Sequence, residues 1–389
     1  MQLVRIALVV VCGGMSLASA QIPEGFELLE ITAAFERLSP PRINNCGQAV
    51  FSRGLYSADT TEVFLYDNGI LTQITENYVS DAAPDISATG TMVWMVGYDG
   101  SNAKDILIFE AGELRAIGPG TFPRINNLGH IVFTRIHRKG CRNVDGDIYF
   151  YDGDTVRRIS DGFLSNQSPE VNDRDEIVWT RYNFCENPWV SDIMFYSDGN
   201  TRQVTARQIE PQEPGINDVS QLVWGGPGGI EVWENGVTRL ITNWGRNGTL
   251  NNHGDVFFLR WHDDNQTWQT WLYLNTGQFL QLTDDPFWNM DGEISDSREI
   301  VWRSLDLNSG RYGVLLLRRI RTGEADFDGD VDLIDYAQFA ACLTGPEWVE
   351  RTHPGPQESL CDCRFLDIDH DGDVDLPDFA LFQNAFTGE

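Results

Sequence analysis

The sequence predicts an all-β fold, a seven-bladed β-propeller closed by an N-terminal strand, followed by a small α-helical calcium-binding module. Three observations predict it: a strand motif that recurs seven times, a strand missing from the last copy, and an abrupt change to acidic composition near the C-terminus. The chain has 389 residues, of which 41% are apolar, so it can bury a sizeable core.

Each repeat begins with an apolar residue followed by Asn or Ser, and a strand with an aromatic residue comes next. The spacings between these apolar residues are 43, 39, 46, 45, 34 and 44 residues, and the residues are Ile43, Ile86, Ile125, Val171, Ile216, Leu250 and Ile294. Self-similarity at this period indicates a repeat architecture. Four of the strand aromatics are tryptophans at one register, which predicts core positions: Trp94, Trp179, Trp224 and Trp302.

The segment 123–160 is the clearest copy and shows the strands of one repeat. A first strand at Ile131–Arg135 precedes a second at Asp147–Tyr151, and a turn leads to a short strand that ends at Ser160. Other copies also have turns rich in Gly, Asn or Asp and last strands that end in Thr or Ser. About four short antiparallel strands per repeat, with no helix, are typical of a propeller blade.

The seventh copy has no matching last strand after Val314–Leu317, but an equivalent strand, Leu28–Thr32, lies near the N-terminus. We therefore expect the N-terminal strand to complete the last blade. Such closure removes sheet edges that would otherwise pair with other chains.

These repeats resemble the TolB-type and PD40-type propeller repeats, in which a turn with Gly precedes an apolar strand. The resemblance spans about residues 26 to 320. It implies the propeller architecture and does not imply the role of TolB, because the usual Ser-Pro-Asp-Gly turn is replaced here by forms such as Asn-Asn-Leu-Gly.

The N-terminus has the features of a secretory signal peptide at residues 1–20. Arg5 gives a positive charge, Ile6–Val11 begins a short apolar run, and Ala18–Ala20 is a small-residue cleavage site. The alternative is an uncleaved anchor, but the run is too short to span a bilayer, and no later stretch is long enough. The sequence thus predicts a secreted or cell-envelope protein with a propeller at 21–322 and a second module at 323–389.

The chain carries a formal net charge of −30, which argues against binding to nucleic acid. Half of this charge lies in residues 324–389, which contain 17 acidic residues and two arginines.

Two loops within this acidic segment follow the plan of an EF-hand-type calcium loop. In the second loop carboxylates occupy positions 1, 3, 5, 9 and 12, with Gly372 at position 6 for the sharp turn. The candidate ligands are Asp367, Asp369, Asp371, Asp373, Asp375 and Asp378. Calcium prefers six to eight oxygen ligands, and Asp373 would contribute its backbone carbonyl.

The first loop lies 43 residues earlier, and its candidate ligands are Glu324, Asp326, Asp328, Asp330, Asp332 and Asp335. Its position 1 is Glu, which is longer than Asp, so we expect the second loop to bind calcium more strongly. A merely acidic, solubilising tail is the alternative.

Two loop–helix units in tandem resemble a type I dockerin, and the resemblance covers residues 324–389. It implies a calcium-folded docking module that binds cohesin-like domains. The contact positions 10 and 11 carry Ser-Thr-like pairs in cellulosomal dockerins but Leu333-Ile334 and Leu376-Pro377 here. A different protein partner, attachment to the cell envelope or a stabilising role is therefore equally compatible with these residues.

Six cysteines remain after removal of the predicted signal peptide. Cys141 and Cys185 lie in equivalent loops of consecutive repeats, so we expect a disulfide between them. Cys342 ends the first predicted helix of the tail, and we expect it to pair with Cys361 or Cys363. A zinc site at the last two cysteines is the alternative.

Four arginines share one register two residues after the strand aromatic: Arg53, Arg135, Arg181 and Arg260. Three acidic residues begin the next strand in the corresponding repeats: Glu62, Asp147 and Asp192. We expect cross-strand ion pairs. A charged ring at the channel mouth that binds an anionic ligand is the alternative.

No catalytic residue is predicted, because the chain has no nucleophile-elbow Ser, no His-Glu-x-x-His and no spaced set of histidines. We expect a non-catalytic binding or scaffold propeller, with a glycan or protein ligand. The alternative is an extracellular polysaccharide-active enzyme, a glycoside hydrolase or lyase, since dockerin-like modules accompany such domains. An enzyme should gather a perturbed carboxylate at one channel mouth, whereas a scaffold should have a satisfied channel.

Overall fold

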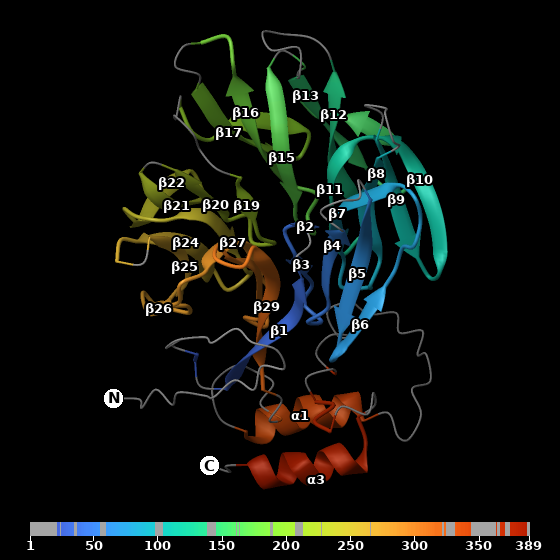
Figure 1. The fold of residues 1–389 in the computed structure, drawn as a ribbon, viewed down its shortest axis with the longest axis vertical. Helices are drawn as coiled ribbons and strands as arrows, with labels where there is room; N and C mark the ends of the chain where they lie inside the picture. Colours follow the sequence, from blue (N-terminus) through green and yellow to red (C-terminus); the bar gives the residue numbers. More distant parts are fainter. Residues whose placement is uncertain are drawn as a thin grey trace.

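Seven sheets are arranged around a common axis, and helices α1 and α3 lie beyond one end of them (Figure 1). The computed structural model describes residues 22–23, 25–34, 37–54, 60–97, 104–137, 145–160, 162, 164–186, 190–206, 213–226, 228–264, 266–320, 323, 331–343, 363, 366–369 and 374–386. The predicted seven-bladed propeller is confirmed. The predicted signal peptide, residues 1–20, lies outside the described residues.

The first four blades follow one another along the chain, each with its innermost strand first. Blade 1 contains β2 (Arg37–Leu38), β3 (Arg42–Ile43), β4 (Ala49–Gly54), β5 (Thr61–Asp67) and β6 (Ile70–Gln73). Blade 2 contains β7 (Ser80–Ile86), β8 (Met92–Gly97), β9 (Lys104–Glu110) and β10 (Glu113–Pro119). Blade 3 contains β11 (Thr121–Ile125), β12 (Ile131–His137), β13 (Asp145–Tyr151) and β14 (Val156–Arg158). Blade 4 contains β15 (Ser165–Val171), β16 (Ile177–Asn183), β17 (Val190–Ser197) and β18 (Asn200–Gln203).

The last three blades include the one that combines both ends of the propeller. Blade 5 contains β19 (Gly215–Ile216), β20 (Leu222–Gly226), β21 (Gly229–Glu234) and β22 (Val237–Thr242). Blade 6 contains β23 (Arg246–Leu250), β24 (Val256–His262), β25 (Thr267–Tyr273) and β26 (Phe279–Gln281). Blade 7 contains β27 (Trp288–Ile294), β28 (Ile300–Asp306), β29 (Arg311–Arg319) and β1 (Phe26–Ala34).

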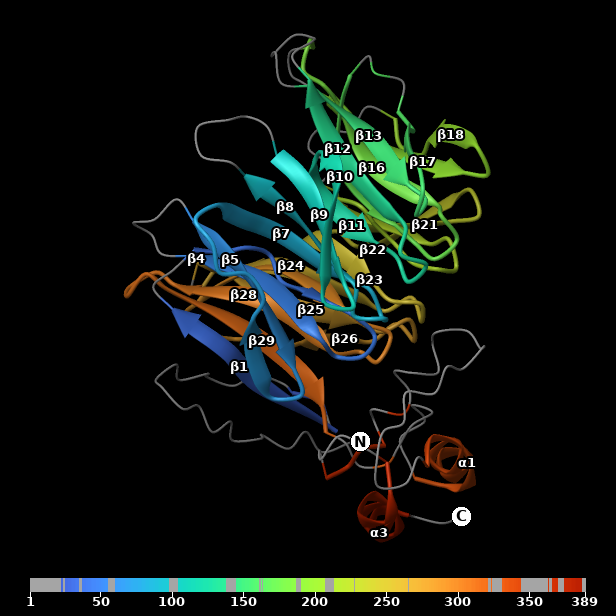
Figure 2. The same cartoon turned by 90° about the vertical axis from the view of Figure 1, so that its right-hand side faces the viewer.

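The N-terminal strand closes the ring, as predicted. Strand β1 pairs antiparallel with β29, so that Leu28 lies opposite Leu317 and Ala34 opposite Tyr312 (Figure 2). The outer edge of β29 is therefore covered by a strand from the other end of the chain. Blade 7 cannot be completed without it.

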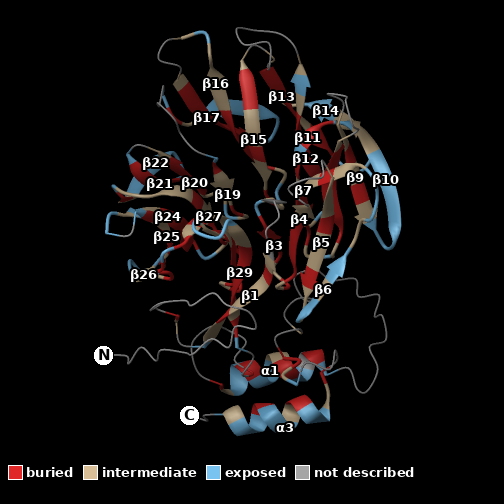
Figure 3. Ribbon diagram, in the orientation of Figure 1, coloured by how far each residue is buried: buried red, intermediate tan, exposed pale blue. Residues whose placement is uncertain are grey.

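Blades are held together by apolar side chains packed between neighbouring sheets. One such cluster joins Phe51 and Tyr66 of blade 1 to Val301 and Leu316 of blade 7. The predicted core tryptophans, Trp94, Trp179, Trp224 and Trp302, are all buried. Buried residues accordingly concentrate in the middle strands, whereas outer strands such as β10 are exposed (Figure 3).

In four blades a Thr or Ser just after the last strand has a local structural role. Its hydroxyl accepts a hydrogen bond from a backbone N–H of the neighbouring strand, for example from Ile148 to Ser160 at 3.0 Å and from Ile193 to Thr205 at 2.8 Å. The bond satisfies a buried backbone donor where the short outer strand stops pairing. A hydroxyl residue is therefore repeated at this position for backbone satisfaction.

The C-terminal helices α1 (Leu333–Cys342) and α3 (Leu376–Ala385) share a small core of their own. Phe339 and Phe382 are buried, and their ring centroids lie 5.0 Å apart. A disulfide joins Cys342 to Cys363, which confirms one of the two predicted pairings of Cys342. Among the described residues, no helix has the length and apolarity needed to cross a membrane.

Replacing Leu28 in β1 by Ala should lower the free energy of unfolding by about 2–5 kcal/mol, because the side chain is buried where blade 7 closes. Leu240→Ala, at an exposed position of an outer strand, is the matched control and should have little effect. Urea denaturation followed by tryptophan fluorescence measures both. Equal losses in the two variants would contradict the closing role of β1.

Candidate functional site

The central channel is lined by one residue from each blade, at the position just before the repeated apolar residue. These residues are Arg42, Asp85, Arg124, Glu170, Gly215, Thr249 and Glu293. In five inner strands a β-bulge with a non-glycine residue at positive φ precedes this position, at Ala83, Phe122, Ser168, Asn247 and Asp291. A bulge bends the strand and re-aims the side chains that follow, here toward the channel.

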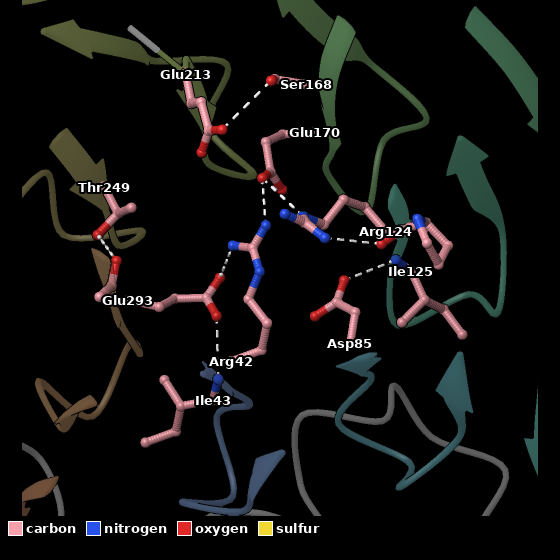
Figure 4. A network of polar contacts seen from close by, with 12 residues as sticks. Arg42, Ile43, Asp85, Arg124, Ile125, Ser168, Glu170, Glu213, Thr249 and Glu293 are labelled. Atoms are coloured by element: carbon pink, nitrogen blue, oxygen red, sulfur yellow. Dashed lines mark hydrogen bonds and ion pairs between the residues drawn. The ribbon is translucent and has the colours of Figure 1, made fainter. Parts of the chain in front are cut away.

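Arg42 bridges carboxylates from distant blades across the channel (Figure 4). Its Nη1 donates to Glu293 Oε1 at 2.9 Å, and its Nη2 pairs with Glu170 Oε1. Arg124 Nε donates to the same Glu170 oxygen at 2.8 Å. The guanidinium of Arg42 thus ties blade 1 to blades 4 and 7 through the centre of the ring.

The carboxylates also accept bonds from the backbone of the following blade. Glu293 Oε2 accepts from the Ile43 N–H at 3.0 Å, and Asp85 Oδ2 accepts from the Ile125 N–H at 2.9 Å. Both donors belong to the repeated apolar residue, so one geometry occurs at two joints of the ring. The network therefore satisfies buried backbone donors as well as buried charges.

Burial shifts the proton affinities of this network. Desolvation raises the pKa of Asp85 to about 7, although the positive charge of Arg42 opposes the shift. Desolvation likewise raises the pKa of Glu170 and Glu293 against the attraction of Arg42. For Arg42 itself burial disfavours the charge, but the surrounding carboxylates outweigh burial and the pKa is raised.

Cavities lie on both sides of the Arg42 network. One, of about 160 Å³, is lined by prolines, Phe122 and charged residues of the network. The other, of about 150 Å³, is lined chiefly by the repeated Asn and Asp residues. We call them the proline mouth and the asparagine mouth.

At the asparagine mouth, hydrogen bonds run from each blade to the next. The Asn127 N–H donates to Asp173 Oδ1 at 2.7 Å, and the Asp173 N–H donates to Asp218 Oδ1 at 2.7 Å. In the same way, the Asp218 N–H donates to Asn252 Oδ1, the Asn252 N–H to Asp296 Oδ1, and the Asp296 N–H to Asn45 Oδ1. The second blade has Ala88 at this position, whose side chain cannot accept a bond. The side-chain ring is thus an open series rather than a closed one.

The repeated Asn of the motif ties the blades together in the same direction. For example, Asn126 Nδ2 donates to the Asn172 carbonyl at 2.8 Å, and Asn172 Nδ2 donates to the Asn217 carbonyl at 2.9 Å. Its Oδ1 meanwhile accepts N–H bonds of its own turn, from Leu128 and His130 in the case of Asn126. This motif residue is structural, since it organises both a turn and a blade interface.

The predicted arginine register does not form the charged ring of the channel. Arg181 pairs with Asp192 at 3.2 Å, as expected for a cross-strand pair. The expected pair of Arg135 and Asp147 is wrong: Arg135 lies over the Tyr149 ring at 4.3 Å and donates to the Pro119 carbonyl. Asp147 instead pairs with His137 at 3.3 Å. Stacking on the aromatic strand residue shields the guanidinium and competes with pairing.

The other two arginines of this register also lie over aromatic rings. Arg53 lies 5.6 Å from the Phe64 centroid, and Arg260 lies 3.9 Å from the Trp244 centroid. Sequence reasoning missed the channel residues themselves. A signal existed, because five of the seven residues before the repeated apolar position are charged.

The structure brings part of the second predicted calcium loop together. Carboxylate oxygens of Asp367, Asp369 and Asp378 lie within 4.8 Å of one another, and the first and last residues are buried. Hard carboxylate oxygens in this arrangement fit calcium, and they would repel one another without a cation. Asp375 lies at the start of α3 as its N-cap, whereas Asp371 and Asp373 lie outside the described residues.

The first predicted calcium loop is described only at its end. Asp335 is fully buried and accepts the Asp332 N–H at 2.8 Å, in a capping box that begins α1. Glu324, Asp326, Asp328 and Asp330 lie outside the described residues. Calcium binding at both loops stays a prediction.

Cysteine pairing is described in part. Cys185 and Cys46 are both disulfide-bonded. Cys141, the predicted partner of Cys185, and Cys361 lie outside the described residues, so the bond from Cys141 to Cys185 stays a prediction.

Comparison with known proteins supports the fold. No protein-family model matches the chain, and no curated protein sequence matches it. Among solved structures, the β-propeller domain of the Trilobed protease from Pyrococcus furiosus is similar, with a TM-score of 0.57 and 12% identity over 74% of this chain and 94% of that chain. That domain is described as having an open velcro topology, whereas β1 pairs with β29 here.

Two further similarities concern larger and more distant proteins. Pyrococcus horikoshii acylaminoacyl peptidase matches with a TM-score of 0.53 and 11% identity over 70% of this chain, which spans about half (49%) of that protein. TolB from Acinetobacter baumannii matches with a TM-score of 0.40 and 11% identity, covering 72% of this chain and 63% of TolB, which is too low to carry an argument. At these identities the likeness shows the propeller fold alone.

Replacing Arg42 by Ala should destabilise the protein by about 3–5 kcal/mol, because Glu170 and Glu293 would lose the cation that compensates for the burial of their carboxylates. Arg115→Ala, on the outer strand β10 with a half-exposed side chain, is the control and should cost under about 1 kcal/mol. Guanidinium chloride denaturation at pH 7 compares them. A loss no larger for Arg42 than for Arg115 would refute the network's role in stability.

Proposed function

We propose that this is an exported, non-catalytic binding protein. In this proposal the propeller is a rigid platform for a glycan or protein ligand. The C-terminal module attaches it, in a calcium-dependent manner, to a cohesin-like or cell-envelope protein. The observation that carries the proposal is the clustering of Asp367, Asp369 and Asp378 beside a pair of helices whose first residues are apolar and exposed.

The exposed residues at the helix starts support a protein partner. Leu333 and Ile334 of α1 are 68% and 55% exposed, and Leu376 of α3 is 75% exposed. They occupy the loop positions where cellulosomal dockerins carry polar contact residues. Large exposed apolar side chains at these positions favour burial against another protein. The partner would accordingly present an apolar surface rather than a polar one.

The state of the channel supports a binding platform over an enzyme. Glu170 and Glu293 are paired with Arg42, and Asp85 accepts backbone N–H groups. These groups hold the ring together, so they are engaged before any substrate arrives. A channel satisfied in this way is what a scaffold requires.

Calcium should order the C-terminal module, since the clustered carboxylates need a cation to pack together. With a calcium chelator, residues 324–389 of the full chain should become sensitive to protease while the propeller stays resistant. Asp378→Asn should lower calcium affinity by tenfold or more, whereas Asp154→Asn, at an exposed turn of the propeller, should not change it. Limited proteolysis and calcium titration measure these effects, and an equally resistant tail with and without calcium would disprove the proposal.

A second candidate function is a polysaccharide-active enzyme, and the raised pKa of Asp85, about 7, favours it. A carboxylic acid that keeps its proton near neutral pH can act as a general acid. Glu170 and Glu293 would then supply the second carboxylate of a glycosidase pair.

If the protein is such an enzyme, Asp85→Asn should lower polysaccharide hydrolysis by at least a hundredfold without unfolding the chain. Asp198→Asn, at an exposed turn, is the control. Reducing-sugar release from a panel of polysaccharides gives the measurement. Absence of release by the folded wild-type protein would eliminate this candidate function.

A further inference from the structure

The proline mouth has a lining that the structural role of the channel does not explain. Four prolines line it together with Phe122, whose side chain is 49% exposed. They are Pro40, Pro41, Pro84 and Pro214. Phe122 adopts a φ of 52°, an unfavourable conformation for a bulky residue. An aromatic ring is thus held at the cavity by a strained bulge and left partly open to solvent.

The charges at this mouth do not cancel. Four carboxylates line the cavity, from Glu170, Glu213, Asp291 and Glu293, against the guanidinium groups of Arg42 and Arg124. Both arginines already contact Glu170, and Arg42 also contacts Glu293. Asp291 pairs with Arg303, which comes from the next strand of the same blade.

Glu213 is the carboxylate left over from this pairing. Among the residues that the structure describes, it makes no ion pair, and its hydroxyl contact, from Ser168 Oγ, is long at 3.5 Å. Its side chain points toward the network (Figure 4), and it lines the proline mouth. Desolvation and the repulsion of Asp291 raise the pKa of Glu213 against the weaker attraction of Arg42, although solvent reaches the side chain in the mouth. A bound positive charge would relieve both effects.

We propose that the proline mouth binds a small organic cation, a primary or quaternary ammonium group, between Glu213 and Phe122. The carboxylate supplies the counter-charge, and the aromatic face and prolines contact the carbon atoms attached to nitrogen. The cavity of about 160 Å³ suits a group of benzene size. An anion would meet an excess of carboxylates, and a neutral sugar would leave Glu213 without a counter-charge.

The inference rests on the proposed binding role and specifies its ligand class on the propeller. It does not depend on the C-terminal module, because no residue of that module lines the cavity among the described residues. Binding measured in the presence of a calcium chelator therefore separates this site from the docking module. If calcium-dependent docking is not observed, the cation-site proposal is unaffected. If no cation binds, the docking proposal is unaffected.

The test is isothermal titration calorimetry of the full chain with n-butylammonium and tetramethylammonium, and with butyrate and butanol as anionic and neutral probes. We expect the cations to bind and the other two not to bind. Glu213→Gln, which keeps the shape and removes the charge, should weaken cation binding about tenfold, equivalent to roughly 1.4 kcal/mol. Glu234→Gln, at the exposed end of β21, is the matched control and should bind like wild type.

Phe122→Leu, which keeps apolar volume and removes the ring, should weaken binding by about threefold if the ring faces the cation. A peptide with one central lysine, compared with n-butylammonium, distinguishes a protein source of the ammonium group from a free amine. The proposal is overturned if no cation binds, if butyrate binds as well as butylammonium, or if Glu213→Gln binds unchanged.

Discussion

The pairing of β1 with β29 is the interaction on which the rest of the structure depends. It joins the two ends of the propeller through backbone hydrogen bonds, beside the apolar cluster that packs blade 1 against blade 7. Arg42 in the first blade can reach Glu293 in the last blade because the ring is closed. A local strand pairing thus determines a contact between residues 251 positions apart in sequence.

Once the ring is closed, buried charge has to be accommodated at its centre. The blades carry different residues at the inner position, and two arginines therefore lie among three carboxylates. Each charged side chain also pairs with a second charge or accepts a bond from a backbone N–H group. These contacts compensate for the desolvation of the buried charges. Replacing one member changes the environment of several others, and the contributions of these residues cannot be additive.

Much of the fold could be predicted because repetition makes side-chain roles visible. The period located the blades, the core tryptophans shared a register, and the missing last strand of the seventh repeat indicated the closing strand Leu28–Thr32. The channel was harder to predict. Charged residues at the inner position differ in sign between repeats, so they average out in a repeat pattern. Arg135 illustrates the same difficulty, since its sequence position indicated Asp147 but its guanidinium lies over Tyr149. In the second predicted calcium loop Asp367, Asp369 and Asp378 lie together, whereas calcium binding at either loop stays a prediction.

The Arg42 network also separates two ends of the channel that differ in their chemistry. The network lies between the two mouths, so its hydrogen-bonded and ion-paired side chains separate a ligand at one mouth from the other mouth. One side offers prolines, an aromatic ring and spare negative charge, whereas the other offers amides and carboxylates that already bond to each other. The two faces of the propeller are therefore chemically distinct. If one face is attached to a surface, the other face stays exposed to solvent.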